Sequence, residues 1–243
     1  MAGFKMHITV SSTLGVGYGL GAFFGYGLPA PSCILAGTLC GVSGMLPDLD
    51  SDSGVPLRES ITFAAASLPM LLIDRFQQLG WTPETMALVG AGVYVAVRFG
   101  LAEIVRKLTV HRGMFHSIPA ALIAAEVFYL IASHNEPTIR LYKAGGVFLG
   151  FMSHLVLDEI YSVSFQGGIP RLKSSFGTAV KFIGDGFLPN LATYAQLIAL
   201  SYFVLQDSQL LDNLPERNLA KPAAPKREAA EQFAEEVWRR VVR

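Results

Sequence analysis

The segment ITVSSTLGVGYGLGAFFGYGL, residues 8–28, contains no Asp, Glu, Lys or Arg. A run of about 20 apolar residues is long enough for an α-helix to cross the hydrocarbon core of a bilayer. A helix also satisfies its own backbone hydrogen bonds, which lipid cannot do. The run is rich in glycine, at Gly15, Gly17, Gly19, Gly21, Gly25 and Gly27. Because small residues let helix backbones approach closely, the segment predicts a membrane helix packed tightly against a neighbour.

The rest of the chain shares this apolar character. Its 243 residues are 51% hydrophobic and 16% charged, and the mean hydropathy is +0.42. A soluble domain of this size cannot bury so much apolar surface, so we expect a lipid bilayer around it. The formal net charge of +0 gives no electrostatic support for a nucleic-acid partner. Cys33 and Cys40 lie in one apolar segment and are expected to be small buried residues, not a disulfide.

Apolar runs near the spanning length predict seven helices. Their ranges are 8–28, 32–46, 60–79, 84–105, 117–133, 142–160 and 186–205. Pro69 interrupts the third, which can therefore be short or re-entrant, so the number of spans is six or seven. Residues 162–185 are rich in Gly and Pro and predict a loop. The expected fold class is all-α, a polytopic membrane helix bundle in residues 1–205.

The composition becomes polar and charged in residues 206–243. This region predicts a linker followed by an amphipathic tail helix, which would lie on the membrane or on a partner. Lys and Arg near the ends of spans are retained on the cytoplasmic side. If the N-terminus is inside, only Arg75, Arg140 and Lys143 fall on the outer side. The distribution of basic residues therefore predicts a cytoplasmic N-terminus.

Ionisable residues beside the apolar runs gather in four places. These are His7, LPDLD at 46–50, HRGMFHS at 111–117 and SHLVLD at 153–158. Ionisable groups at membrane depth are costly to bury and are functional candidates by default. In the seven-span topology all four lie at the cytoplasmic edge, so one site could collect them.

The spacing within these motifs suits a metal site. His154 and Asp158 are four residues apart in a helical run, so their side chains share one face and can chelate a cation. Asp48 and Asp50 follow Pro47 in a turn or extended segment, where two carboxylates can converge on a metal.

The motif HRGMFHS is expected to span the boundary between a loop and a helix. His111 is placed on the loop and His116 at the helix start. Ser117 is a plausible N-cap, and Pro119 is tolerated in the first turn. Arg112 has the chemistry to hold a phosphate by two hydrogen bonds, although it could equally be a topology anchor.

Histidine nitrogens and carboxylate oxygens are the ligands of zinc, manganese or iron in hydrolytic sites. There the metal lowers the pKa of bound water, so that hydroxide forms near neutral pH. The number of candidate ligands suffices for one or two divalent ions.

The order of these motifs resembles the YdjM-like family of LexA-regulated, inner-membrane-associated metal-dependent hydrolases, over roughly residues 5–160. The resemblance implies a multi-pass protein of the bacterial inner membrane. It also implies a metal site formed by His7, Asp48, Asp50, His111, His116, His154 and Asp158. The ligand order is similar to that of zinc-dependent phospholipase C enzymes as well, which suggests a phosphoester or lipid substrate. The chain departs from the family pattern at Phe115, where Thr is common, and in its charged tail.

We therefore expect a membrane-bound, metal-dependent hydrolase that acts on a phosphoester or lipid-like ester, with zinc as the first choice of ion and the site facing the cytoplasm. The principal ligands would be His7, Asp48, His116, His154 and Asp158. Asp50 and His111 would be further ligands or bases, and Arg112 would hold phosphate.

Two alternatives from other classes use the same sequence features. One is a metal-ion transporter or sensor, in which the same residues form a transit site. It would need ligands accessible from both sides, whereas the motifs cluster at one. The other is a non-catalytic membrane scaffold whose tail helix recruits a partner.

Overall fold

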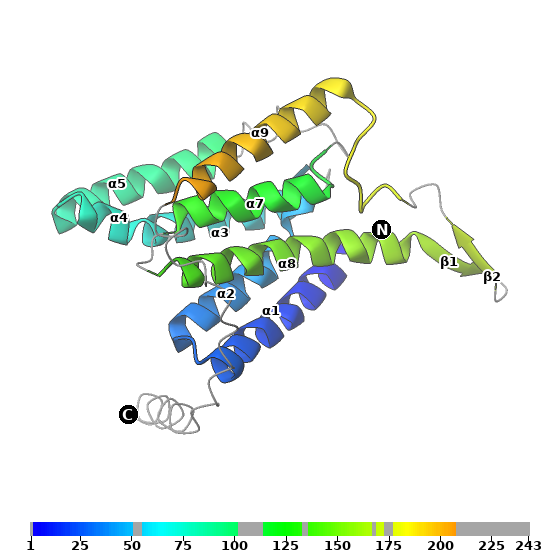
Figure 1. Cartoon of the computed structure of the whole chain (residues 1–243), viewed down its shortest axis with the longest axis horizontal. Coiled ribbons are helices and arrows are strands. Elements are labelled where there is room, and N and C mark those ends of the chain that lie inside the picture. The colour runs from blue at the N-terminus through cyan, green and yellow to red at the C-terminus, as the bar shows by residue number, and fades with distance from the viewer. Residues whose placement is uncertain are drawn as a thin grey trace.

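The chain folds almost entirely into helices, as its computed structural model shows (Figure 1). The structure describes residues 2–50, 55–101, 114–132, 136–166, 169–172 and 177–207. The helices are α1 (Phe4–Tyr26), α2 (Ala30–Ser43), the 3-10 turn η1 (Leu46–Asp50), α3 (Val55–Leu71), α4 (Ile73–Gln78), α5 (Pro83–Val95), the π-helical η2 (Ala96–Leu101), α7 (Ile118–Ile131), α8 (Pro137–Tyr161) and α9 (Phe187–Leu205). The predicted helical class is confirmed.

Within the described residues, each predicted apolar run lies mainly on helical structure. The fourth run, 84–105, covers α5 and the adjoining η2, and residues 102–105 lie outside the described part of the chain. The third run, 60–79, forms two helices, α3 and α4, which meet at Leu72, just beyond Pro69. Among the described residues, three helices are long and apolar enough to cross a membrane: Phe4–Tyr26, Ala30–Asp48 and Phe187–Leu205. Helix α7 is apolar but shorter. The total of six or seven spans therefore stays a prediction. The tail helix was predicted within residues 206–243, and the described part of the chain ends at residue 207.

The segment predicted as a loop at 162–185 contains two short strands. Strand β1 (Val163–Gln166) pairs antiparallel with β2 (Ile169–Leu172), and Ser164 lies opposite Arg171. The prediction was wrong for these residues because it weighted the Gly and Pro content of the whole segment over the short β-branched and aromatic runs within it. The hairpin continues from the end of α8 and projects away from the bundle (Figure 1).

Helices α1, α2 and α8 pack through glycines at which their backbones nearly touch. A Cβ atom added to Gly15 would collide with the carbonyl of Gly37, and one added to Gly150 would collide with the carbonyl of Cys40. The predicted role of small residues is thus confirmed for Gly15, while a Cβ at Gly17 would have no neighbour within 4 Å. The three helices form the closely packed half of the bundle.

Side-chain hydrogen bonds fasten the same three helices. The Tyr18 hydroxyl donates to the Tyr142 carbonyl oxygen over 2.8 Å, and the Tyr142 hydroxyl donates back to the Tyr18 carbonyl oxygen over 2.6 Å. Their rings stack with centroids 4.4 Å apart. Cys33 and Cys40 are both buried and free, as predicted.

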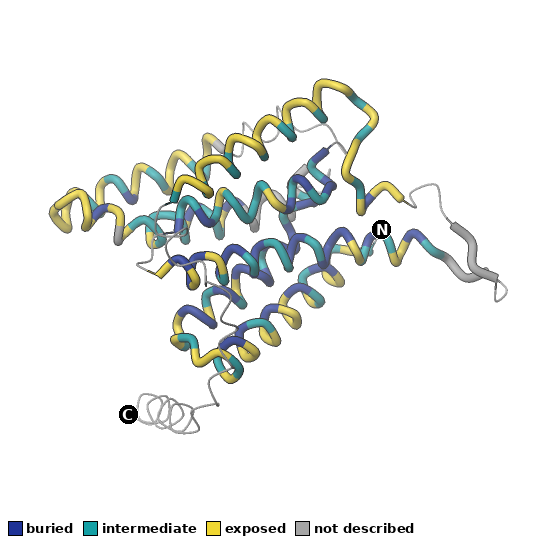
Figure 2. Tube along the Cα trace, viewed as in Figure 1, coloured by how far each residue is buried: buried dark blue, intermediate teal, exposed yellow. Residues whose placement is uncertain are grey.

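The other half of the bundle packs less tightly. Helix α7 lies between α8 and α9, while α3 packs against α5, η1 and η2 (Figure 1). Figure 2 shows buried positions concentrated on α8 and exposed ones on α5 and α9. None of the residues of α9 is buried. Its C-terminal end is attached by Asp207, which accepts a 2.6 Å hydrogen bond from the buried guanidinium of Arg140.

Candidate metal centre

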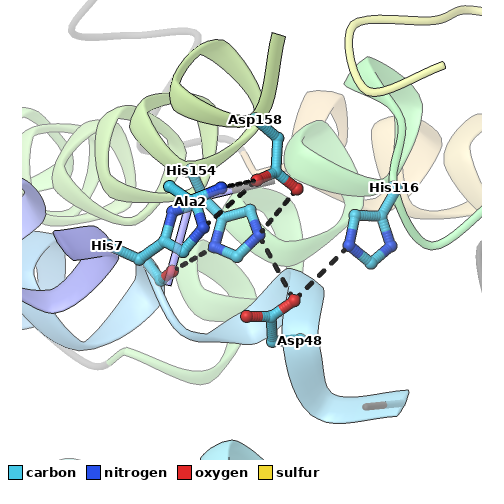
Figure 3. A network of polar contacts seen from close by, with 7 residues as sticks. Ala2, His7, Asp48, His116, His154 and Asp158 are labelled. Atoms are coloured by element: carbon cyan, nitrogen blue, oxygen red, sulfur yellow. Dashed lines mark hydrogen bonds and ion pairs between the residues drawn. The ribbon is translucent and has the colours of Figure 1, made fainter. Parts of the chain in front are cut away.

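Five of the predicted ligands meet at one end of the helix bundle (Figure 3). They come from the start of α1, from η1 after the end of α2, from the residue two positions before α7, and from the last two turns of α8. Because these elements alternate in direction, those ends lie together. The ligands are His7, Asp48, His116, His154 and Asp158.

Local structure holds each side chain in place. His154 and Asp158 lie one turn apart on α8, as their spacing predicted. Ser117 is the N-cap of α7 and accepts a hydrogen bond from the Ala120 amide over 3.3 Å, and Pro119 lies in the first turn. Both features were predicted, and the cap fixes the backbone immediately after His116.

The side chains are buried to different degrees. His154 is fully buried, and His7, His116 and Asp158 are 2–4% exposed. The Asp48 side chain is 19% exposed. Among these five residues, Asp48 therefore marks the side from which a small molecule could reach the cluster.

The separations between ligand atoms are too long for good hydrogen bonds. Asp48 Oδ1 lies 3.5 Å from His154 Nε2 and 3.7 Å from His116 Nε2. Asp158 Oδ2 lies 3.7 Å from His154 Nε2. An N–H···O hydrogen bond has a donor–acceptor distance of about 2.7–3.2 Å. Two ligands of one tetrahedral zinc ion, with bonds of about 2.0–2.2 Å, stand about 3.3–3.5 Å apart. The spacing is closer to that of a metal shell.

The tautomer of His154 leaves one ring nitrogen that could bind a cation. Its Nδ1 lies 2.7 Å from the carbonyl oxygen of Gly44. A carbonyl only accepts, so Nδ1 carries the proton, and a neutral ring then has a bare lone pair on Nε2. That atom is buried without a hydrogen-bond partner among the described residues and faces oxygens of Asp48 and Asp158. A nitrogen lone pair facing two carboxylates is repulsive unless a metal ion or a proton lies between them.

Other buried polar atoms of the cluster are also unpartnered. Within the described part of the chain, both ring nitrogens of His116, Nδ1 of His7 and Oδ2 of Asp158 have no hydrogen-bond partner. Buried polar atoms are rarely left so. A metal ion in one of the two possible ligand sets would bind His154 together with either His116 or Asp158, so the residues present fit a divalent cation.

His154 belongs to both sets of ligands that the geometry allows. One set is His7, His154 and Asp158, and the other is Asp48, His116 and His154, with ligand atoms within 4.8 Å of one another in each. Because Gly44 occupies Nδ1, His154 has one nitrogen to offer and can bind one ion only. The cluster could therefore hold either a single shared ion, or two ions of which one lacks His154.

His7 is held against this shared histidine. The two rings stack with centroids 3.6 Å apart and planes 12° from parallel. His7 Nε2 lies 3.3 Å from Asp158 Oδ1, which also accepts a hydrogen bond from the Ala2 amide over 3.0 Å. The stack and the contact with Asp158 therefore hold His7 at the edge of the cluster.

Three predicted residues cannot be placed. His111 and Arg112 lie outside the described residues, and so does the side chain of Asp50. Sequence reasoning also missed two backbone groups of the site, the Gly44 carbonyl and the Ala2 amide. A backbone group has no side-chain signature, so no sequence signal could have identified either.

Helices apolar enough for a bilayer, joined around a buried histidine and aspartate cluster, define this chain as a helical membrane protein with a potential metal site. The chain belongs to the YdjM inner membrane protein family, whose family model matches residues 1–211. The resemblance found in the sequence motifs is thereby confirmed. No curated protein and no solved structure matches the chain.

Proposed function

We propose that this chain is a metal-dependent hydrolase of the bacterial inner membrane, multi-pass, with its site facing the cytoplasm, and that it cleaves a phosphoester or lipid-like ester. The observation that supports this most is the buried, unpartnered Nε2 of His154, which faces oxygens of Asp48 and Asp158. A nitrogen so placed is ready to ligate a cation.

The ion would be held by His154 with Asp48 and His116, or with His7 and Asp158. Mixed nitrogen and oxygen ligands suit zinc first, and manganese or iron next. When bound, such an ion polarises an ester oxygen and lowers the pKa of water in its shell.

The protein's own groups orient the ligands and define access. The Gly44 carbonyl fixes the His154 tautomer, which directs Nε2 toward the carboxylates. Asp48, the most exposed of the five, marks the approach for substrate. Asp50 follows Asp48 by two residues, and His111 and Arg112 precede His116 by five and four. We propose Asp50 and His111 as bases, and Arg112 as the group that holds the phosphate.

The position of the cluster weighs against a transporter. A transport path would have metal-binding side chains distributed between the two ends of the spans. These five side chains lie together at one end. A resident ion fits that distribution better. A metal sensor or a non-catalytic scaffold would lack hydrolysis, which the assay below measures directly.

The test compares His154→Ala with His134→Ala, which removes a histidine outside the four motifs. Full-length protein purified from zinc-supplemented cells is measured by elemental analysis, and then for cleavage of a soluble phosphodiester. We expect zinc in the wild type and in His134→Ala, and a loss of about tenfold or more in His154→Ala. Equal zinc in all three proteins would remove His154 from the site, and zinc without any hydrolysis would leave a binding protein.

A further inference from the structure

An apolar cavity of about 430 Å³ lies between two parts of the bundle. Its lining comes from α3, from Val97 of η2, and from α2, η1, α7, α8 and α9. The size is within the range of sites that bind small molecules, about 300–1,000 Å³. Its polar side chains are few and scattered: Ser43, Ser67, Thr193 and Gln196.

One end of the cavity is lined by residues that neighbour the candidate metal ligands in the sequence. Leu46, in its lining, precedes Asp48 by two residues, and Met114 and Phe115 directly precede His116. Phe151 lines it as well and lies one turn before His154 on α8. Three of the elements that carry ligands therefore also build the near end of the cavity.

The cavity extends from that end along α7. Its lining runs from Ala120, in the first turn, to Ile131, the last residue of the helix. At 1.5 Å per residue this stretch of helix is about 16 Å long. Half the hydrocarbon thickness of a bilayer is about 15 Å. The length matches the depth of one lipid leaflet.

We propose that this cavity binds one hydrocarbon chain of a membrane lipid, whose ester- or phosphate-bearing end lies at the His154 cluster. The inference rests on the proposed function and specifies its substrate class. Water is a poor occupant because an ordered water needs two to four polar partners, which these walls rarely offer. A hydrocarbon chain gains dispersion contacts with the walls on both sides.

The test uses the full chain in bilayer nanodiscs with a phosphatidylglycerol that carries a diazirine near the end of one acyl chain. After irradiation, labelled residues are located by mass spectrometry. We expect labels on lining residues of α3 and α7, such as Phe63 and Val127. Labels confined to α1, which contributes no residue to the lining of this cavity, would overturn the inference.

A matched pair of variants tests the cavity itself. Ala64 lines it, whereas Ala66 on the same helix is exposed and does not. Ala64→Trp should lower cavity labelling by about tenfold or more, because each excluded methylene weakens binding. Ala66→Trp should label as the wild type does. If Ala64→Trp does not accumulate in membranes, Ser67→Phe fills the cavity from the same wall. Equal labelling in the cavity-filling and exposed variants would refute the proposal.

Failure of this inference can be separated from failure of the proposed function. If the wild type cleaves a soluble phosphodiester but its cavity is not labelled, the chain-binding inference is wrong and the hydrolase proposal stands. If the cavity is labelled as expected but the wild type binds no metal and cleaves neither the soluble phosphodiester nor the phosphatidylglycerol, the hydrolase proposal is wrong and the chain-binding inference stands.

Discussion

Replacing Gly150 with alanine should weaken metal binding without touching a ligand. An added Cβ would overlap the Cys40 carbonyl oxygen and the Ser43 hydroxyl of α2. Ordinary carbon–oxygen contacts are about 3.3 Å or longer, so restoring one requires α8 to move from α2 by about 1 Å or more. Because His154 lies one turn beyond Gly150, its Nε2 would move relative to Asp48 by a similar amount.

The size of the effect follows from that displacement. Overpacking a close helix contact costs about 1–3 kcal/mol of unfolding free energy. Disturbing the groups that orient metal ligands lowers affinity by about 10–100-fold. We therefore expect Gly150→Ala to bind zinc at least about tenfold more weakly, since the shift is several times the tolerance of about 0.2 Å in a metal–ligand distance.

The assay is zinc competition with a chromogenic chelator, together with thermal unfolding of the same samples. Gly17→Ala is the matched control, because a Cβ there has no neighbour within 4 Å, and alanine should stabilise the helix by about 1 kcal/mol. If Gly150→Ala binds zinc as tightly as Gly17→Ala does, close packing of α2 and α8 does not position the site.

Three further outcomes are expected. Ser117→Ala removes the N-cap of α7, so the unfolding free energy should fall by about 1 kcal/mol and zinc affinity should fall with it as His116 loosens. Asp207→Asn leaves the charge of Arg140 buried without its carboxylate, which should destabilise the protein by about 3 kcal/mol in thermal unfolding. Protons compete with the ion for imidazoles and carboxylates, so zinc content measured after dialysis should decrease from about pH 7 to about pH 5, and unchanged content would argue against histidine ligation.

The helices were predictable because lipid imposes a simple requirement on length and polarity. Within the described residues the seven ranges lie mainly on helices, and the run containing Pro69 is divided at Leu72, between α3 and α4. The hairpin of β1 and β2 was missed because a four-residue strand has no periodicity long enough to stand out against its flanking glycines.

The proximity of the histidines and aspartates in the candidate metal centre was predictable from the sequence, whereas their detailed geometry was less so. His154 and Asp158 were found from helical spacing, and Asp48 and His116 from their positions at the ends of apolar runs. The tautomer of His154 could not be predicted, because it depends on a contact with the Gly44 carbonyl, which is 110 residues away in the sequence. The stacking of His7 on His154 likewise depends on how closely α1 and α8 approach.

Helix α9 has no buried residue, and within the described part of the chain a few side-chain hydrogen bonds fasten its C-terminal half to α7 and α8: Ser201 donates to Glu126, and Asp207 accepts from Arg140 and Tyr129. Its apolar surface is therefore left to annular lipid, and solubilisation that strips this lipid should release α9 before the rest. Hydrogen exchange in α9 would then report how native a given detergent preparation is.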